Sequence, residues 1–272
     1  MAVLVHCNFT THERRFWMYR IVVFGLTALL TLSLVTITNA EMSEKAKMGR
    51  ELFSDPSFGG TLDPGKASGL SCSDCHADFD EATNPDGRIR AGHSIVGVPH
   101  RGTAKGGMIT ADIFERAAGG GGFCYQHFLQ KIPSDKVDPI AIPEEQAAAL
   151  MAYFAHVSGD NKGPQFQITM LDKDAASAAA DKIMEMKGDT QKGWKLYGQA
   201  CNVCHPTAKK AGIGSQLVKR RPPRDLEKRK HHIAAYVRKG GFTMPFFSED
   251  RLSDQDIADI VAFIGKLVEE NK

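Results

Sequence analysis

The clearest hydrophobic pattern lies near the C-terminus, where apolar residues recur at helical spacing. A helix predicted at 253–269 collects on one face Ile257, Ile260, Val261, Ile264, Leu267 and Val268. Ser253 and Asp256, three residues apart, are close to a capping box at its start. We expect this face to pack on the interior of the protein.

A second amphipathic segment predicts a helix at 143–158, where Pro143 precedes two glutamates of the first turn. Each of these helices has an earlier counterpart, at about 42–53 and about 187–200. Both counterparts carry a Gly-x-x-Leu-aromatic pattern, formed by Gly49, Leu52 and Phe53 and by Gly193, Leu196 and Tyr197. The chain therefore repeats one helical plan twice.

This repetition predicts an all-α fold with two loop-rich domains in tandem, at 41–160 and 187–272. Glycine and proline mark a linker at 158–170, and the alanine-rich segment at 172–186 predicts a helix, so the region 161–186 joins the domains. The first domain has an insertion at 54–70, which is rich in Gly, Pro, Asp and Ser and predicts a loop.

Residues 1–40 have the pattern of an export signal. Arg14, Arg15 and Arg20 precede an uncharged apolar run at 21–37, and a small-x-small site ends at Ala40. We predict a signal peptide at 1–40 and a periplasmic protein. The alternative is an uncleaved membrane anchor, although the run is short of the about 20 residues that a full span needs. Met18 is an alternative start.

Composition is that of a globular chain, with 42% hydrophobic and 24% charged residues and a formal net charge of +2. This balance excludes a general affinity for polyanions such as nucleic acids. The six cysteines carry more information. Four of them form two Cys-x-x-Cys-His motifs, Cys72–His76 and Cys201–His205. Beyond the signal region, only Cys124 lies outside these motifs.

Two thiols followed directly by a histidine are what covalent attachment of a c-type haem requires, with the histidine as proximal iron ligand. Chance, a zinc knuckle or a redox dithiol are the alternatives. Two such motifs, each after a Gly-x-x-Leu-aromatic helix in an exported chain, favour haem. We therefore predict two covalently attached haem c groups, held by Cys72, Cys75 and His76 and by Cys201, Cys204 and His205.

Most of the chain after the signal segment resembles the class I cytochrome c family. The resemblance implies a small helical domain around each haem, with a sixth iron ligand from a loop before the closing helix. In the second copy the matching residue is Met244, in Met244-Pro245, and this ligand implies a raised reduction potential. Core packing is the alternative role for Met244, and His231 and His232 are rival ligands.

The sixth ligand of the first haem stays open between Cys124, His127 and Met108, with His93, His100 and His156 as further alternatives. The segment 113–129 resembles the haem domain shared by thiosulfate dehydrogenases and SoxA cytochromes, in which an axial cysteine aligns with Cys124. This chain departs from that pattern at His127, where the family usually has arginine. A buried thiol without a ligand role is the other reading of Cys124.

The opening of the first copy, Gly49 to Pro56, also resembles the dihaem cytochrome c peroxidases, but no peroxide-activating constellation accompanies it. Charge differs between the motifs. Acidic residues flank the first, at Asp74, Asp78, Asp80, Glu81 and Asp86. Basic residues follow the second, at Lys209, Lys210, Lys219, Arg220, Arg221, Arg224, Lys228, Arg229, Lys230, Arg238 and Lys239. This basic run is either a solvated face or a docking surface for an acidic redox partner.

Three functions follow as hypotheses. The first is electron transfer between redox partner proteins in the periplasm. The second is oxidation of small sulfur anions at a cysteine-ligated first haem, as in thiosulfate dehydrogenases. The third is a peroxidase. In the second case the cationic donors that match a sulfur oxyanion are Arg101, Lys105, Arg116 and His127.

Overall fold

The computed structural model describes residues 41–60, 67–104, 107–164, 170–210, 212–219, 225–241 and 243–271. Within these ranges the chain is helical and has no strand, and one isolated bridge joins Ala104 to Ile109. The all-α prediction is confirmed. The predicted signal peptide at 1–40 lies outside the described residues. Among the helices that are described, none is long and apolar enough to cross a membrane.

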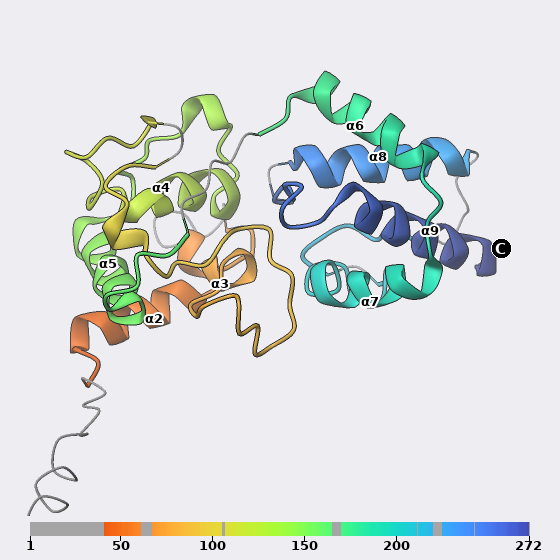
Figure 1. Ribbon diagram of the computed structural model, residues 1–272. Coiled ribbons are helices and arrows are strands. Elements are labelled where there is room, and N and C mark those ends of the chain that lie inside the picture. Colours follow the sequence, from red (N-terminus) through yellow and green to blue (C-terminus); the bar gives the residue numbers. More distant parts are fainter. Residues whose placement is uncertain are drawn as a thin grey trace, which may run out of the picture. The chain divides into compact units, whose positions relative to one another are not determined.

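In the first half of the chain, α2 (Glu44–Ser54) crosses α5 (Glu144–Ser158), as Figure 1 shows. The crossing is close because Gly49 faces the backbone of α5, where a Cβ would overlap the carbonyl of Ala149. The ring of Phe53 then packs 5.7 Å from that of Tyr153, between ring centroids. The glycine and the aromatic residue of the first repeated pattern thus both serve the helix crossing.

The second half repeats this crossing with α7 (Thr190–Ala200) and α9 (Asp254–Glu270). A Cβ on Gly193 would overlap the carbonyl of Asp259, and the ring centroids of Tyr197 and Phe263 lie 5.5 Å apart. The buried carboxylate of Asp259 accepts a hydrogen bond of 2.8 Å from the backbone N–H of Asp189, the residue that caps α7. A buried polar group needs such a partner.

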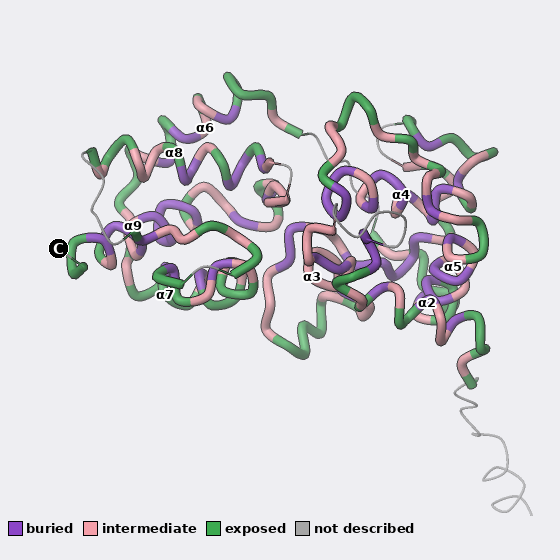
Figure 2. The backbone as a smooth tube through the Cα atoms, turned by 180° about the vertical axis from the view of Figure 1, so that it is seen from behind, coloured by how far each residue is buried: buried purple, intermediate pink, exposed green. Residues whose placement is uncertain are grey.

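The predicted hydrophobic face of α9 forms the centre of the second core. Among its residues Ile257, Ile260, Val261, Ile264 and Val268 are buried, and Figure 2 shows them as purple stretches of α9. The predicted capping box is present, because the side chains of Ser253 and Asp256 each accept from the backbone of the other residue. Pro143 is the N-cap of α5, and two glutamates occupy its first turn.

Two further helices pack against each other, α6 (Lys173–Glu185) and α8 (Leu226–Lys239). The sequence predicts α6 at 172–186, and its Ala180 and Ile183 belong to the core that α9 organises. Helix α8 was not predicted, because its segment is dominated by lysine and arginine. Its few apolar residues nevertheless share one side, where Ile233, Ala234 and Val237 are buried.

Short turns complete the first half: η1 (Phe58–Gly60), α3 (Cys72–Cys75), η3 (Val98–His100), η5 (Ala118–Gly120), α4 (Gly121–Cys124), η6 (Tyr125–Leu129) and η7 (Ser134–Lys136). The insertion at 54–70 is predicted to be a loop, and its described part contains η1, whose Phe58 is buried against Tyr125. By their contacts, residues Met42–Lys272 form one unit. The predicted boundary between two domains therefore stays a prediction.

Candidate haem-binding sites

The first Cys-x-x-Cys-His motif forms the single turn α3. The backbone N–H of Ser71 donates to the carboxylate of Asp74 at 2.8 Å and so fixes the start of the turn. At its end the N–H of His76 donates to the carbonyl of Cys72 at 2.9 Å. This turn presents the two cysteines and the histidine on adjacent positions of a rigid backbone.

A loop from the following segment orients the imidazole of His76. The Nδ1 atom donates to the carbonyl of His93 at 2.7 Å, and the N–H of Gly92 donates to the carbonyl of Cys75 at 2.8 Å. Gly92 lies flat against the ring, since a Cβ there would overlap Cε1 of His76. With its proton on Nδ1, the neutral ring offers the lone pair of Nε2 to a metal.

The second motif has the same geometry. The N–H of His205 donates to the carbonyl of Cys201 at 2.9 Å, and the N–H of Gly214 donates to that of Cys204 at 2.9 Å. Nδ1 of His205 donates to the carbonyl of Ser215 at 2.7 Å, and a Cβ on Gly214 would again overlap Cε1 of the histidine. The sequence separation between histidine and glycine differs in the two copies, so the match is one of tertiary structure.

The thiols of both motifs suit thioether formation. Cys72, Cys75, Cys201 and Cys204 form no disulfide. Burial raises the pKa of Cys72 to about 12, with a further increase from nearby Cys124, and burial raises the pKa of Cys201 to about 12 as well. Their thiols are neutral at pH 7. Among the described residues no group of histidines, cysteines and carboxylates could by itself hold a metal ion.

Two neutral thiols with a histidine whose Nε2 is presented as a ligand fit haem c. A haem c held by these residues would supply one-electron chemistry between ferrous and ferric iron.

Met244 lies where the class I pattern expects a sixth ligand, between α8 and α9. Its carbonyl accepts from the N–H of Gly241 at 2.8 Å, closing a turn that begins at Gly240 with a positive φ of 73°. Its side chain packs against the same core as Cys201. The rival histidines face elsewhere. His231 contacts Asp181 on α6 at 3.0 Å, and His232 is exposed.

Cys124 lies beside the thiols of the first motif. Burial raises the pKa of both Cys72 and Cys75, and nearby Cys124 adds to both increases, so Cys124 lies in the neighbourhood of the first motif. Cys124 ends α4, and the π-helical turn η6 follows it directly. Such turns are frequent at functional sites. The structure thus brings Cys124 to the first candidate haem site.

The other candidate ligands of this site are placed differently. Met108 is 53% exposed. His127 is buried between Phe123 and Phe128, and its Nδ1 lies 2.7 Å from the carbonyl of Ile132. Of these two, only His127 has the burial and the orienting hydrogen bond of a ligand histidine.

The side chains of the remaining candidate histidines are either exposed or bonded to other groups. His100 and His156 are exposed, and Nε2 of His100 lies 3.0 Å from the carbonyl of Gly159. Burial lowers the pKa of His93, with Arg251 contributing, so its ring is neutral at pH 7. Nε2–H of His93 donates to Asp250 at 2.9 Å.

The candidate anion-binding residues have structural contacts of their own. Arg101 donates to the carbonyl of Val96 at 3.3 Å, and burial lowers the pKa of its guanidinium. Arg116 pairs with Glu144 at 3.1 Å. Lys105 lies outside the described residues.

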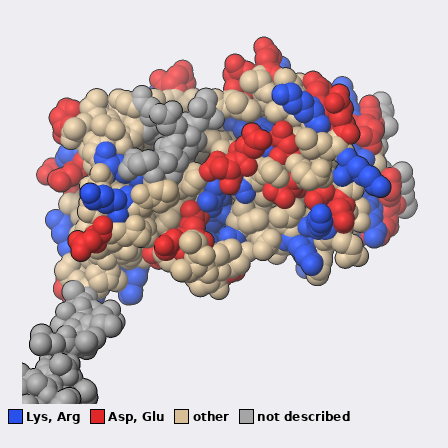
Figure 3. All heavy atoms as spheres, viewed as in Figure 1, with Lys and Arg blue, Asp and Glu red and all other residues tan. Residues whose placement is uncertain are grey.

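One member of the basic run is not a surface residue. Arg238 is 4% exposed, pairs with Asp254, and donates to the carbonyls of Phe247 and Leu252 at 3.0 and 2.7 Å. Its inclusion in a solvated or docking face was wrong, because it joins α8 to the start of α9. Arg220, Arg221 and Arg224 lie outside the described residues. On the face that Figure 3 shows, basic and acidic side chains are interspersed.

Several acidic residues near the first motif form hydrogen bonds or ion pairs with other residues of the chain. Asp78 accepts from the hydroxyl of Tyr153 at 2.5 Å, and Glu81 pairs with Arg251. Asp86 pairs with Arg90 at 2.6 Å, and that hydrogen bond lowers the pKa of Asp86 to about 2. The sequence alone did not reveal these partners, nor the roles of Gly92 and Gly214, because no motif in the neighbouring sequence predicts their contacts.

Comparison with known families identifies part of the chain. Residues 188–264 match the family described as "Cytochrome C oxidase, cbb3-type, subunit III". Searches of curated proteins and of solved structures gave no match. The matched segment spans α7, the second motif, α8 and most of α9, and so contains the complete second site. Residues 188–264 are therefore similar to a class I c-type cytochrome domain, and this similarity supports an electron-transfer haem protein.

Proposed function

We propose that this protein is a periplasmic dihaem cytochrome that passes electrons between redox partners. The observation that carries the proposal is the duplicated proximal geometry. At each motif the histidine Nδ1 donates to a backbone carbonyl at 2.7 Å, and a glycine without side chain lies against the ring. A site built twice in this way supports a second haem beside the one in the matched domain.

The two sites differ in the sixth ligand that we assign. His205 and Met244 would hold the second haem, at a raised potential, because a thioether favours ferrous iron. His76 and Cys124 would hold the first at a lower potential, because a thiolate favours ferric iron. This difference would direct electrons from the first haem to the second. The basic residues that remain on the surface, such as Lys209, Lys228 and Lys239, would meet an acidic acceptor.

Haem counting tests the proposal. The mature protein should carry two haems by mass and by pyridine haemochrome. The double variant Cys72→Ala/Cys75→Ala should carry one and keep the near-infrared band of methionine-ligated ferric haem. The double variant Cys201→Ala/Cys204→Ala should also carry one haem but lack that band. The variant Met244→Ala should keep both haems and lack the band. A wild-type protein with a single haem contradicts the proposal.

A second candidate function is oxidation of small sulfur anions at the first haem. The position of Cys124 beside Cys72 and Cys75 favours it, given the resemblance to thiosulfate dehydrogenases. Thiosulfate should then reduce an artificial electron acceptor through the wild-type protein and not through Cys124→Met. A thiolate-ligated haem without this activity would leave the protein an electron carrier.

A further inference from the structure

The two Cys-x-x-Cys-His motifs lie against each other. Cys204 packs on the hydrophobic core of the first half, the same core against which Cys72 packs. Burial raises the pKa of Cys75, and Cys204 of the other motif adds to this increase, in agreement with the packing. The guanidinium of Arg88, which donates to the carbonyl of Asp74 at 3.2 Å, also acts on Cys204.

Backbone contacts support this arrangement independently of the thiols. The N–H of Ile89 donates to the carbonyl of Gln199 at 3.0 Å, two residues before the second motif. A Cβ on Gly69, shortly before the first motif, would lie 3.9 Å from Ile213, shortly after the second. Contacts on both flanks of each motif thus place the motifs edge to edge.

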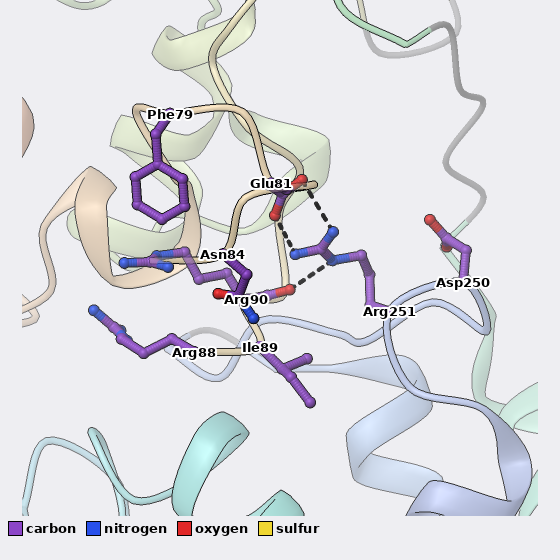
Figure 4. Close-up of a pocket in the computed structure, with 8 residues that line it drawn as sticks. All are labelled: Phe79, Glu81, Asn84, Arg88, Ile89, Arg90, Asp250 and Arg251. Carbon is purple, nitrogen blue, oxygen red and sulfur yellow. Dashed lines mark hydrogen bonds and ion pairs between the residues drawn. The ribbon is translucent and has the colours of Figure 1, made fainter. Parts of the chain in front are cut away.

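A polar cluster of four residues joins the two halves at this place, and we call it the clamp: Glu81, His93, Asp250 and Arg251. Figure 4 shows the guanidinium of Arg251 beside the carboxylate of Glu81, and both residues line the same small pocket. Its two amino groups lie 3.1 and 2.5 Å from the carboxylate oxygens, and Nε donates to the carbonyl of Arg90 at 2.7 Å. Such bidentate pairing gives geometric specificity as well as energy.

The central pair of the clamp, Glu81 and Arg251, is partly buried and is supported by neighbouring residues. The side chains of Arg251 and Glu81 are 13% and 25% exposed, so solvent screens their pairing only in part. Glu81 also accepts from the N–H of Ser94 at 3.0 Å. Arg90, whose carbonyl accepts from Arg251, lies over the ring of Phe79 and donates to the carbonyl of Ser73 at 3.2 Å. This contact connects the clamp to the first motif.

Both ends of the clamp continue into loops that orient iron ligands. The carbonyl of His93 orients the proximal His76, while the ring of His93 donates to Asp250. Asp250 and Arg251 belong to the same inter-helix loop as Met244. A displacement at the clamp would therefore move one site relative to the other.

We propose that the facing edges of the two motifs, at Cys75 and Cys204, form the route by which an electron passes directly between the two haems. Glu81 and Arg251 are positioning residues that keep these two edges close together. The inference rests on the proposed dihaem function. With both haems bound, the step would oxidise the ferrous iron of one and reduce the ferric iron of the other, with no proton transferred. Electron transfer slows steeply with distance, so the closeness of the edges sets its rate.

The test uses the full dihaem protein. After a fast pulse of a small reductant, wild type should show redistribution of the electron between the haems at a rate independent of protein concentration. In Arg251→Gln most of this phase should be lost. The magnetic interaction between the two ferric haems, measured by paramagnetic resonance relaxation, should weaken in parallel. Lys230→Gln, which removes a comparable pair with Glu227 on α8, should change neither readout.

The outcomes separate the inference from the proposed function. Fewer than two haems overturns both. Two haems with redistribution that depends on protein concentration overturns the route alone. Unchanged redistribution and magnetic interaction in Arg251→Gln and in Glu81→Gln overturns the positioning role. Faster electron redistribution in the charge-swap variant Glu81→Arg/Arg251→Glu than in Arg251→Glu supports the positioning role. Unperturbed absorption spectra of each haem show that the variants are folded.

Discussion

Gly92 lies so close to the imidazole of His76 that no larger residue fits between the loop and the ring. The same loop supplies the carbonyl that holds Nδ1 of the histidine. The position of one glycine thus decides how the imidazole of His76, the proposed proximal ligand, is oriented.

Gly92→Ala should therefore impair the first haem site. The added methyl group would push the ring of His76 away or break its bond to the His93 carbonyl, and haem content should fall toward one per chain with the methionine-ligated haem retained. Gly198→Ala is the matched control, because a Cβ there meets nothing within 4 Å. Full content of both haems in Gly92→Ala would contradict the assigned geometry.

Replacing Arg238 by methionine should destabilise the protein. The change leaves the Asp254 carboxylate and the carbonyls of Phe247 and Leu252 without their donor, at a cost of about 3 kcal/mol in the free energy of unfolding. Urea unfolding measures this. The exposed neighbour offers a control, since Lys239→Met should change stability by less than about 0.5 kcal/mol. Equal changes in unfolding free energy for the two substitutions would contradict the buried, stabilising role of Arg238.

Cys124→Met should change the first haem and leave the second unaltered. A thiolate at this site gives a low-spin ferric signal of narrow anisotropy, which the variant should lose, and its potential should rise because a thioether stabilises ferrous iron better. Paramagnetic resonance and a redox titration measure both effects. Absence of the narrow signal in wild type would pass the ligand role to His127 or Met108, and His127→Ala would then distinguish them.

The ion pair of Asp86 with Arg90 should contribute to stability in a pH-dependent way. The pKa of Asp86 is about 2 in the folded chain and is higher when unfolded, so the contribution is present at neutral pH and is lost as the pH falls toward 2. Asp86 is largely exposed, and screening limits the contribution to about 1 kcal/mol. Asp86→Asn should lower the unfolding free energy at pH 7 by this amount, and the difference should shrink as the pH falls toward 2. A pH-independent difference would exclude the ion pair as its cause.

Much of the helical framework was predictable because its signals are local. Helices α2, α5, α6, α7 and α9 lie within a few residues of the ranges predicted from apolar spacing and caps. Helix α8 escaped because charged residues outnumber its apolar ones, and only packing against α6 shows that Ile233 and Val237 face a core. The buried Arg238 within it was likewise read as one more surface charge.

The sequence by itself determined the candidates for haem attachment and iron ligation: two Cys-x-x-Cys-His motifs, a Met-Pro loop and one additional cysteine. The two motifs are recognisable because thioether attachment demands fixed residue types at short spacing. Only the tertiary structure decided which backbone carbonyl orients each histidine, that Cys124 reaches the first motif, and that Arg251 pairs with Glu81. These contacts join residues far apart in the chain, and their energies arise from burial and hydrogen bonding that no local pattern encodes.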